Sequence, residues 1–149
     1  MPDILSGFTE ADLLSQLPKS VRQSISTLET QQVKWDEVGT LLASGPTAGI
    51  SLKGGGRWSG ALWQSVKKEF HSFLCSDSST YADLRREWDL LRQKSSAMAL
   101  ASLSGLIGSQ LGVASGVIAP LVIWAAVVAL RIGKEAACAA MTAPPQPPA

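Results

Sequence analysis

Charged residues are scarce in this chain and are missing altogether from one long stretch. They make up 17% of the 149 residues, whereas soluble domains average about 25%. No Asp, Glu, Lys or Arg occurs from Ser95 to Leu130. An apolar stretch of this length is typical of a membrane segment. The scarcity of charge therefore makes the C-terminal third the most informative part of the sequence.

Cysteine and histidine are also scarce, which limits the chemistry that the chain can support. The two cysteines, Cys75 and Cys138, imply no disulfide framework. His71, the only histidine, lies one helical turn before Cys75. A structural zinc site usually has four Cys or His ligands, and a Cys–His nucleophile pair needs a third group to orient the ring. We therefore expect no metal site, no cofactor, no catalytic residue and no enzymatic activity.

The N-terminal residues lack the features of a cleaved secretory signal. Residues 1–10 contain no basic n-region and no apolar h-region. Residues 1–50 carry three Lys and Arg against six Asp and Glu, whereas residues 51–94 carry eight against five. An acidic head argues against binding to nucleic acid. We therefore expect residues 1–94 to be cytoplasmic and the acidic head to accept a protein partner.

Residues 1–44 form this acidic head, in which the apolar pattern predicts short amphipathic helices. Val21, Ile25 and Leu28 follow one another at the spacing of a helical face. Short helices of this kind bury only a small core, so we expect the head to need a partner for stability or to dock on another protein. Residues 45–57 are rich in Gly and Pro and are predicted to be a flexible linker.

Residues 58–94 are predicted to form two amphipathic helices that pack antiparallel through a turn at residues 75–79. The apolar stripe of the first helix contains Trp58, Leu62, Val66, Phe70, Phe73 and Leu74. Aromatic residues beside lysines are also typical of a helix that lies in a membrane interface. The candidate interface residues are Trp58, Trp63, Lys67 and Lys68. Packing against a neighbouring helix in a small bundle is the favoured alternative.

Residues 95–133 are predicted to be an apolar membrane segment. A single helix from Ser95 to Leu130 would be ~54 Å long, whereas the hydrocarbon core of a bilayer is ~30 Å thick. Only the strongly apolar residues 111–130 match the length of one spanning helix. We prefer a single span. A membrane hairpin with both ends on one side and a buried helix of a soluble protein remain as alternatives.

Small residues recur along this segment in a pattern that is typical of close helix packing. The helix-packing seam consists of Ala101, Gly105, Gly108, Gly112, Ser115, Gly116 and Ala119. In lipid, helices associate where small residues let two backbones approach closely. The seam therefore predicts a homo-oligomer. Gly116 and Pro120 also predict a kink, because Pro120 has no N–H to donate to the carbonyl of Gly116.

Together these patterns predict an all-α protein. It would have a small amphipathic helical head, a helical hairpin, a C-terminal Gly-rich transmembrane helix and a Pro-rich disordered tail at residues 134–149. The expected function is that of a small, membrane-anchored, self-associating protein with membrane lipid as its partner, such as an effector that perturbs a membrane or forms a pore. The alternative is a soluble helical adaptor whose apolar C-terminal helices are buried in a partner or a homo-oligomer.

Overall fold

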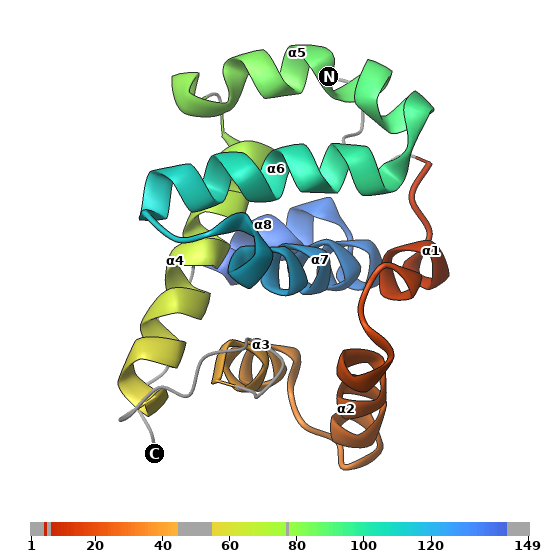
Figure 1. The fold of residues 1–149 in the computed structure, drawn as a ribbon, viewed down its shortest axis with the longest axis vertical. Helices are drawn as coiled ribbons and strands as arrows, with labels where there is room; N and C mark the ends of the chain where they lie inside the picture. Colours follow the sequence, from red (N-terminus) through yellow and green to blue (C-terminus); the bar gives the residue numbers. More distant parts are fainter. Residues whose placement is uncertain (1–4, 6, 45–54, 77, 143–149) are drawn as a thin grey trace.

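The computed structural model describes residues 5, 7–44, 55–76 and 78–142, and all the regular structure in these residues is helical (Figure 1). The helices are α1 (Glu10–Ser15), α2 (Lys19–Thr30), α3 (Trp35–Ser44), α4 (Gly55–Cys75), α5 (Ala82–Lys94), α6 (Ser96–Leu111), α7 (Ser115–Ile132) and α8 (Lys134–Thr142), with a short 3-10 turn at Ser79–Tyr81 before α5. The predicted all-α fold is confirmed.

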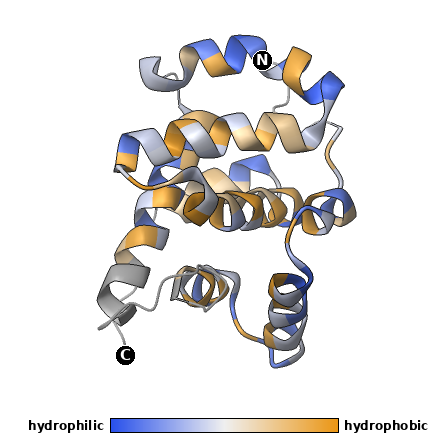
Figure 2. Cartoon of the chain, viewed as in Figure 1, coloured by the Kyte–Doolittle hydropathy of each residue, from blue (hydrophilic) through white to orange (hydrophobic). Residues whose placement is uncertain are grey.

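Helix α7 lies at the centre of the bundle, between helices from both ends of the chain. It packs against α6 along its length and also against α1, α3, α4 and α8. Every side chain from Leu121 to Ala129 is at most 6% exposed. The ribbon of α7 is mostly apolar, whereas polar residues lie on the outer helices (Figure 2). A helix that is apolar on all sides is stable in water only when it is covered in this way.

Helices α6 and α7 form an antiparallel hairpin and not one long helix (Figure 1). The chain turns at residues 112–114, where Gly112 adopts a φ of +70°. The N–H of Val113 donates a hydrogen bond of 2.9 Å to the carbonyl of Gly108, which ends α6. Pro120 lies inside α7 and does not end a helix, so the kink expected at Gly116 and Pro120 stays a prediction.

Helix α5 does not pair with α4 in the predicted antiparallel arrangement. It packs along α6 and reaches only the C-terminal end of α4. Arg85 makes that contact, since its guanidinium donates to the carbonyls of Phe73 at 3.0 Å and Ser72 at 3.2 Å. These carbonyls have no intrahelical partner at a helix end, so α5 caps α4 and crosses it.

The structure differs from the sequence prediction at two other segment boundaries. Residues 134–142 form α8, although we expected the disordered tail to begin at residue 134. Their Ala-rich sequence has high helix propensity. Gly55 and Gly56, placed in the predicted linker, belong to the first turn of α4. Residues 45–54 and 143–149 lie outside the described residues, so the rest of the linker and of the tail is not tested.

The acidic head is not a separate unit. Leu13 of α1, Val21 of α2 and Val38 of α3 are buried in the same apolar core as α7. The short helices of the head are confirmed, and the support that they need is supplied by the C-terminal half of the chain.

Candidate functional site: the α6–α7 hairpin

The α6–α7 hairpin is the most distinctive feature of the molecule, because none of its residues from Ser95 to Leu130 carries a charge. Helix α6 has 16 residues and α7 has 18, which corresponds to ~24 Å and ~27 Å. Both lengths approach the ~30 Å of a bilayer core. Helix α7 is long and apolar enough to cross a membrane, with a mean hydropathy of 2.0. The buried core helix of a soluble protein has the same properties.

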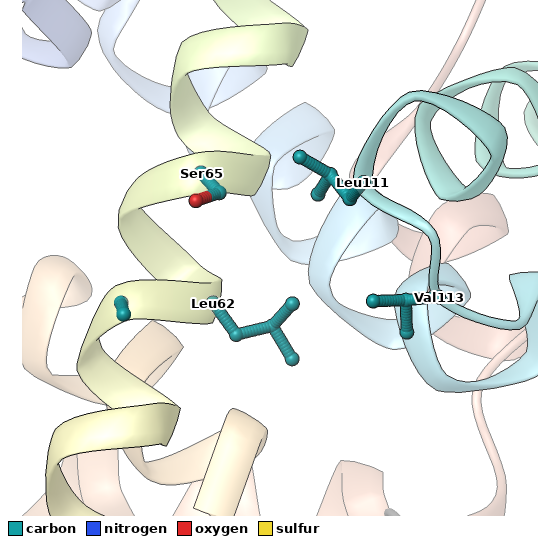
Figure 3. Close-up of a pocket in the computed structure, with 5 residues that line it drawn as sticks. Leu62, Ser65, Leu111 and Val113 are labelled. Carbon is teal, nitrogen blue, oxygen red and sulfur yellow. The ribbon is translucent and has the colours of Figure 1, made fainter.

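The tip of the hairpin lies at the surface of the bundle and is uncharged. Gly112, Ala114, Ser115 and Gly116 are exposed. Leu111 and Val113 are half-buried and face α4 across a hollow of about 180 Å³. In Figure 3, Leu62 of α4 points into this hollow toward Val113, and Leu111 lies across from Ser65.

The predicted helix-packing seam is divided by the turn. Ala101, Gly105 and Gly108 lie on α6, whereas Ser115, Gly116 and Ala119 lie on α7. Gly108 is buried because the chain doubles back over it, and a Cβ there would be 2.5 Å from the carbonyl oxygen of Val113. In the described part of the chain, nothing lies within 4 Å of a Cβ built at Gly105, Gly112 or Gly116. One continuous seam is therefore wrong, and packing of these small residues against a second copy stays a prediction.

Two of the candidate membrane-interface residues are in the interior. Trp63 is fully buried, and the side chain of Lys67 is only 4% exposed. The ammonium of Lys67 lies 2.5 Å from Oδ1 of Asp36 and 5.7 Å from the ring centres of Trp35 and Trp63. Trp63 Nε1 donates to the same Oδ1 at 2.7 Å. This ion pair, in which only Lys67 is buried, joins α4 to α3, so Trp63 and Lys67 do not form a lipid-facing surface.

The other two interface candidates differ. Lys68 is exposed, as expected, whereas the side chain of Trp58 lies outside the described residues. The importance of Asp36 was not evident from the sequence. Its partner follows it by 31 positions, and no local pattern connects residues that far apart.

Arg131 attaches the acidic head to the base of the hairpin. It lies in the last turn of α7, pairs with Glu10 of α1 and lies 2.5 Å from Glu29 of α2. Its guanidinium also lies 5.4 Å from the ring centre of Trp124. The hydrogen bond from Arg131 holds the pKa of Glu10 below its ordinary value. Carboxylates that we expected to meet a protein partner are thus engaged within the chain.

A disulfide between Cys75 and Cys138 joins the end of α4 to α8, with the two Cα atoms 5.9 Å apart. The sequence did not predict it, because two cysteines separated by 63 positions carry no pairing signal. In the preferred single span these residues would lie on opposite sides of a layer ~30 Å thick. The structure contradicts that topology, since α4 and α8 pack side by side.

The described residues contain no group of three or more His, Cys, Asp or Glu that could hold a metal ion. The sulfur of Cys75 is bonded to Cys138 and is not available to His71 as a nucleophile. Comparison of the chain with protein-family models, curated proteins and solved structures finds no match.

Proposed function

We propose that this protein is a non-enzymatic, membrane-active effector that shelters the apolar α6–α7 hairpin in a helical bundle and inserts it into a lipid bilayer. The observation that carries the proposal is the absence of charge from Ser95 to Leu130, combined with a tip that lies at the surface of the bundle. Membrane lipid is the partner, and the hairpin associates with further copies once it is inserted.

The charges around the hairpin support insertion with the tip first. Both ends of a hairpin lie on one side, so Arg92 and Lys94 before it and Arg131 and Lys134 after it would stay together on the side of entry. This arrangement follows the tendency of basic residues to remain on one side of a membrane. The tip has only small, polar or apolar residues to carry across.

The bundle also explains how so apolar a helix stays in solution. Helices α1, α3, α4 and α8 cover α7 in water, and lipid chains would replace them in a bilayer. Apolar side chains are removed from water in both states, so the two states compete. The localisation that follows is a membrane, with residues 1–94 on the side from which the hairpin enters.

A soluble helical adaptor is the second candidate. We expected its apolar C-terminal helices to be buried in a partner or a homo-oligomer, whereas α7 is covered by its own chain, which favours a soluble bundle. A buried α7 needs no partner to cover it. An adaptor would then dock through its surface, where Leu90 is 64% and Met98 46% exposed. In this case the hairpin never leaves the bundle.

A charge placed at the tip separates the two candidates. Ser115 is exposed and begins α7, where no acidic residue is present in the first turn. An acidic side chain is favourable at a helix N-terminus, so Ser115→Asp should leave the soluble fold intact. Carrying that carboxylate through a bilayer would cost ~2.5–3.5 kcal/mol. We expect about a hundredfold slower dye release from lipid vesicles, and less protein retained on vesicles after an alkaline wash.

The matched control is Ser20→Asp. Ser20 is exposed in the first turn of α2, which also has no acidic residue there. This variant adds the same charge at the same kind of position, away from the hairpin, and should release dye at the rate of the unmodified protein. Equal rates for both variants, or no retention of the unmodified protein on vesicles, would reject insertion and favour the adaptor.

A further inference from the structure

We propose that the Cys75–Cys138 disulfide is a redox lock, which keeps the α6–α7 hairpin in the bundle until a dithiol reductant opens it. The inference rests on the proposed insertion of the hairpin and assigns its regulation. The bond is a covalent crosslink between α4 and α8, the helix that directly follows the hairpin.

The disulfide closes a loop that contains the whole α6–α7 hairpin. The bonded residues are 63 positions apart, and α5, α6 and α7 lie between them. Cys75 is the last residue of α4, and Cys138 is in the middle of α8. Both side chains are partly exposed, so a reductant in solution can reach them.

The bond also keeps α8 docked beside α7. A single residue, Gly133 with a φ of +89°, separates the two helices. Ala137 and Met141 place α8 in the core, on either side of Cys138. While Cys138 remains bonded to Cys75, whose Cα lies 5.9 Å away, the end of α7 stays within about 27 Å of Cys75 even if residues 133–138 become fully extended. Reduction removes this limit and leaves only non-covalent contacts at the base.

The ion pairs at the base of the hairpin stabilise the closed bundle less than the disulfide does. Arg131 is paired with Glu10 and Glu29, whose side chains are 39% and 36% exposed, and exposed ion pairs contribute little. Insertion requires α7 to separate from its covering helices, among them α4 and α8, and the bond ties these two helices together. The crosslink therefore disfavours open states in which α8 leaves α4. For a loop of this length the entropic effect on a fully unfolded chain is about a thousandfold. An open state that keeps α6 and α7 helical is disfavoured by less, and we expect an effect of at least tenfold.

The chemistry of opening is thiol–disulfide exchange. A thiolate of the dithiol attacks one sulfur of the pair, the bond between Cys75 and Cys138 breaks, and a mixed disulfide forms. The second thiol of the reductant then attacks that mixed disulfide. The reductant is released as a disulfide, which is cyclic for a small dithiol. Two electrons and two protons are transferred, so Cys75 and Cys138 end as thiols. Disulfides persist in oxidising compartments and are reduced in the cytosol. The lock would therefore open when the protein passes from an oxidising compartment into the cytosol.

Dye release from vesicles tests the lock in the full chain. Oxidised protein, protein reduced with dithiothreitol, and the Cys75→Ser/Cys138→Ser double variant without reductant are added to the same vesicles. We expect the reduced protein and the double variant to release dye at least tenfold faster than the oxidised protein. Dithiothreitol should not change the rate of the double variant.

Further outcomes separate this proposal from the one on which it rests. Equal release by oxidised and reduced protein overturns the lock and leaves hairpin insertion standing. No release by any form overturns both. If the double variant fails to fold, the two redox states of the unmodified chain still decide the result. Reduced Ser115→Asp protein serves as the last control, since a rate equal to that of reduced unmodified protein would show unspecific disruption by an unfolded chain and overturn the lock.

Discussion

Gly39 of α3 lies directly against the indole ring of Trp63, where α3 and α4 pack together. A Cβ at this position would overlap Cε2, Cδ2 and Cζ2 of that ring. Trp63 is fully buried and is held by its hydrogen bond to Asp36, so it cannot move aside easily. The close approach of α3 to α4 therefore depends on this glycine.

We predict that Gly39→Ala lowers the free energy of unfolding by about 1–3 kcal/mol, the usual cost of overpacking a core. Helix propensity acts in the opposite direction, since alanine is better than glycine by ~1 kcal/mol. Gly105→Ala is the matched control, because its Cβ would meet nothing within 4 Å in the described part of the chain. Urea denaturation followed by circular dichroism should show a loss for Gly39→Ala and no loss for Gly105→Ala. Equal stabilities would mean that α3 and α4 do not approach as described.

The ion pair of Asp36 and Lys67 is buried on one side only, which predicts an asymmetry between its two members. The side chain of Lys67 is 4% exposed and that of Asp36 is 45% exposed. Removing the carboxylate leaves a buried cation without a counter-ion, with only the rings of Trp35 and Trp63 beside it, whereas removing the cation leaves a carboxylate that water can reach. We expect Asp36→Ala to cost about 3 kcal/mol and Lys67→Met about 1 kcal/mol, measured by urea denaturation. A larger loss for Lys67→Met would contradict the described burial.

At the scale of elements, the contact of α1 with the base of α7 should depend on pH. The hydrogen bond from Arg131 lowers the pKa of Glu10 relative to its ordinary value of 4.5. A lowered pKa in the folded state stabilises the fold above the unfolded pKa, and this contribution is lost as the pH falls through the folded pKa. We therefore expect the unfolding free energy to drop below about pH 4.5. Glu10→Gln should remove this part of the drop and cost ~0.5–1 kcal/mol at pH 7.

Thermal unfolding of both proteins from pH 7 to pH 3 measures the effect. The difference between the unmodified protein and Glu10→Gln should be largest at neutral pH and should vanish in acid. A difference that stays constant with pH would show that the Glu10 carboxylate is not paired with Arg131 in solution.

The small residues on the outside of the hairpin provide a test of self-association that leaves the fold unchanged. Gly105 and Gly116 have open space around a Cβ, so Gly105→Leu and Gly116→Leu should be tolerated within one chain. Between two copies, the larger side chains would hold the backbones apart. We expect crosslinking of the double variant in detergent or bilayers to shift from oligomer to monomer. An unchanged ladder would reject the small residues as a contact.

Gly108 and Gly112 would be poor choices for this test. Gly108 is packed under the carbonyl of Val113, and Gly112 has a positive φ. Substitutions there would disrupt the turn itself, so a loss of oligomer would have two explanations.

The sequence predicted the elements better than their arrangement. Val21 and Ile25 follow helical spacing, and that local pattern was enough to identify α2. The turn at Gly112 was not predicted, because several glycines in one apolar stretch are all compatible with a turn and only tertiary contacts select one. The crossing of α5 over the end of α4 depends on Arg85 meeting distant carbonyls, which no periodicity contains.

At the scale of the whole molecule, the same apolar helix is compatible with two environments. An all-round apolar sequence such as Leu121–Ala129 satisfies a bilayer and a protein core equally well. What distinguishes them is whether the rest of the chain can cover the helix. Here α1 and α3 from the head and α8 from the C-terminal end do so, although α8 was predicted to be a disordered tail. The candidate site, a sheltered hairpin, therefore emerges only from the complete fold.

The disulfide should make a large contribution to the stability of this bundle. Closing a loop of 63 residues restricts the unfolded chain by ~4 kcal/mol in the chain-entropy model. For a chain of this size, that corresponds to a decrease in Tm of about 8–16 °C on reduction. Scanning calorimetry with and without dithiothreitol measures the shift, and Cys75→Ser/Cys138→Ser should melt at the lower temperature with no response to the reductant. A Tm that is the same with and without reductant would mean that α8 is held on α4 without the bond. The covering of α7 by α8 would then depend on the apolar contacts of side chains such as Ala137 and Met141.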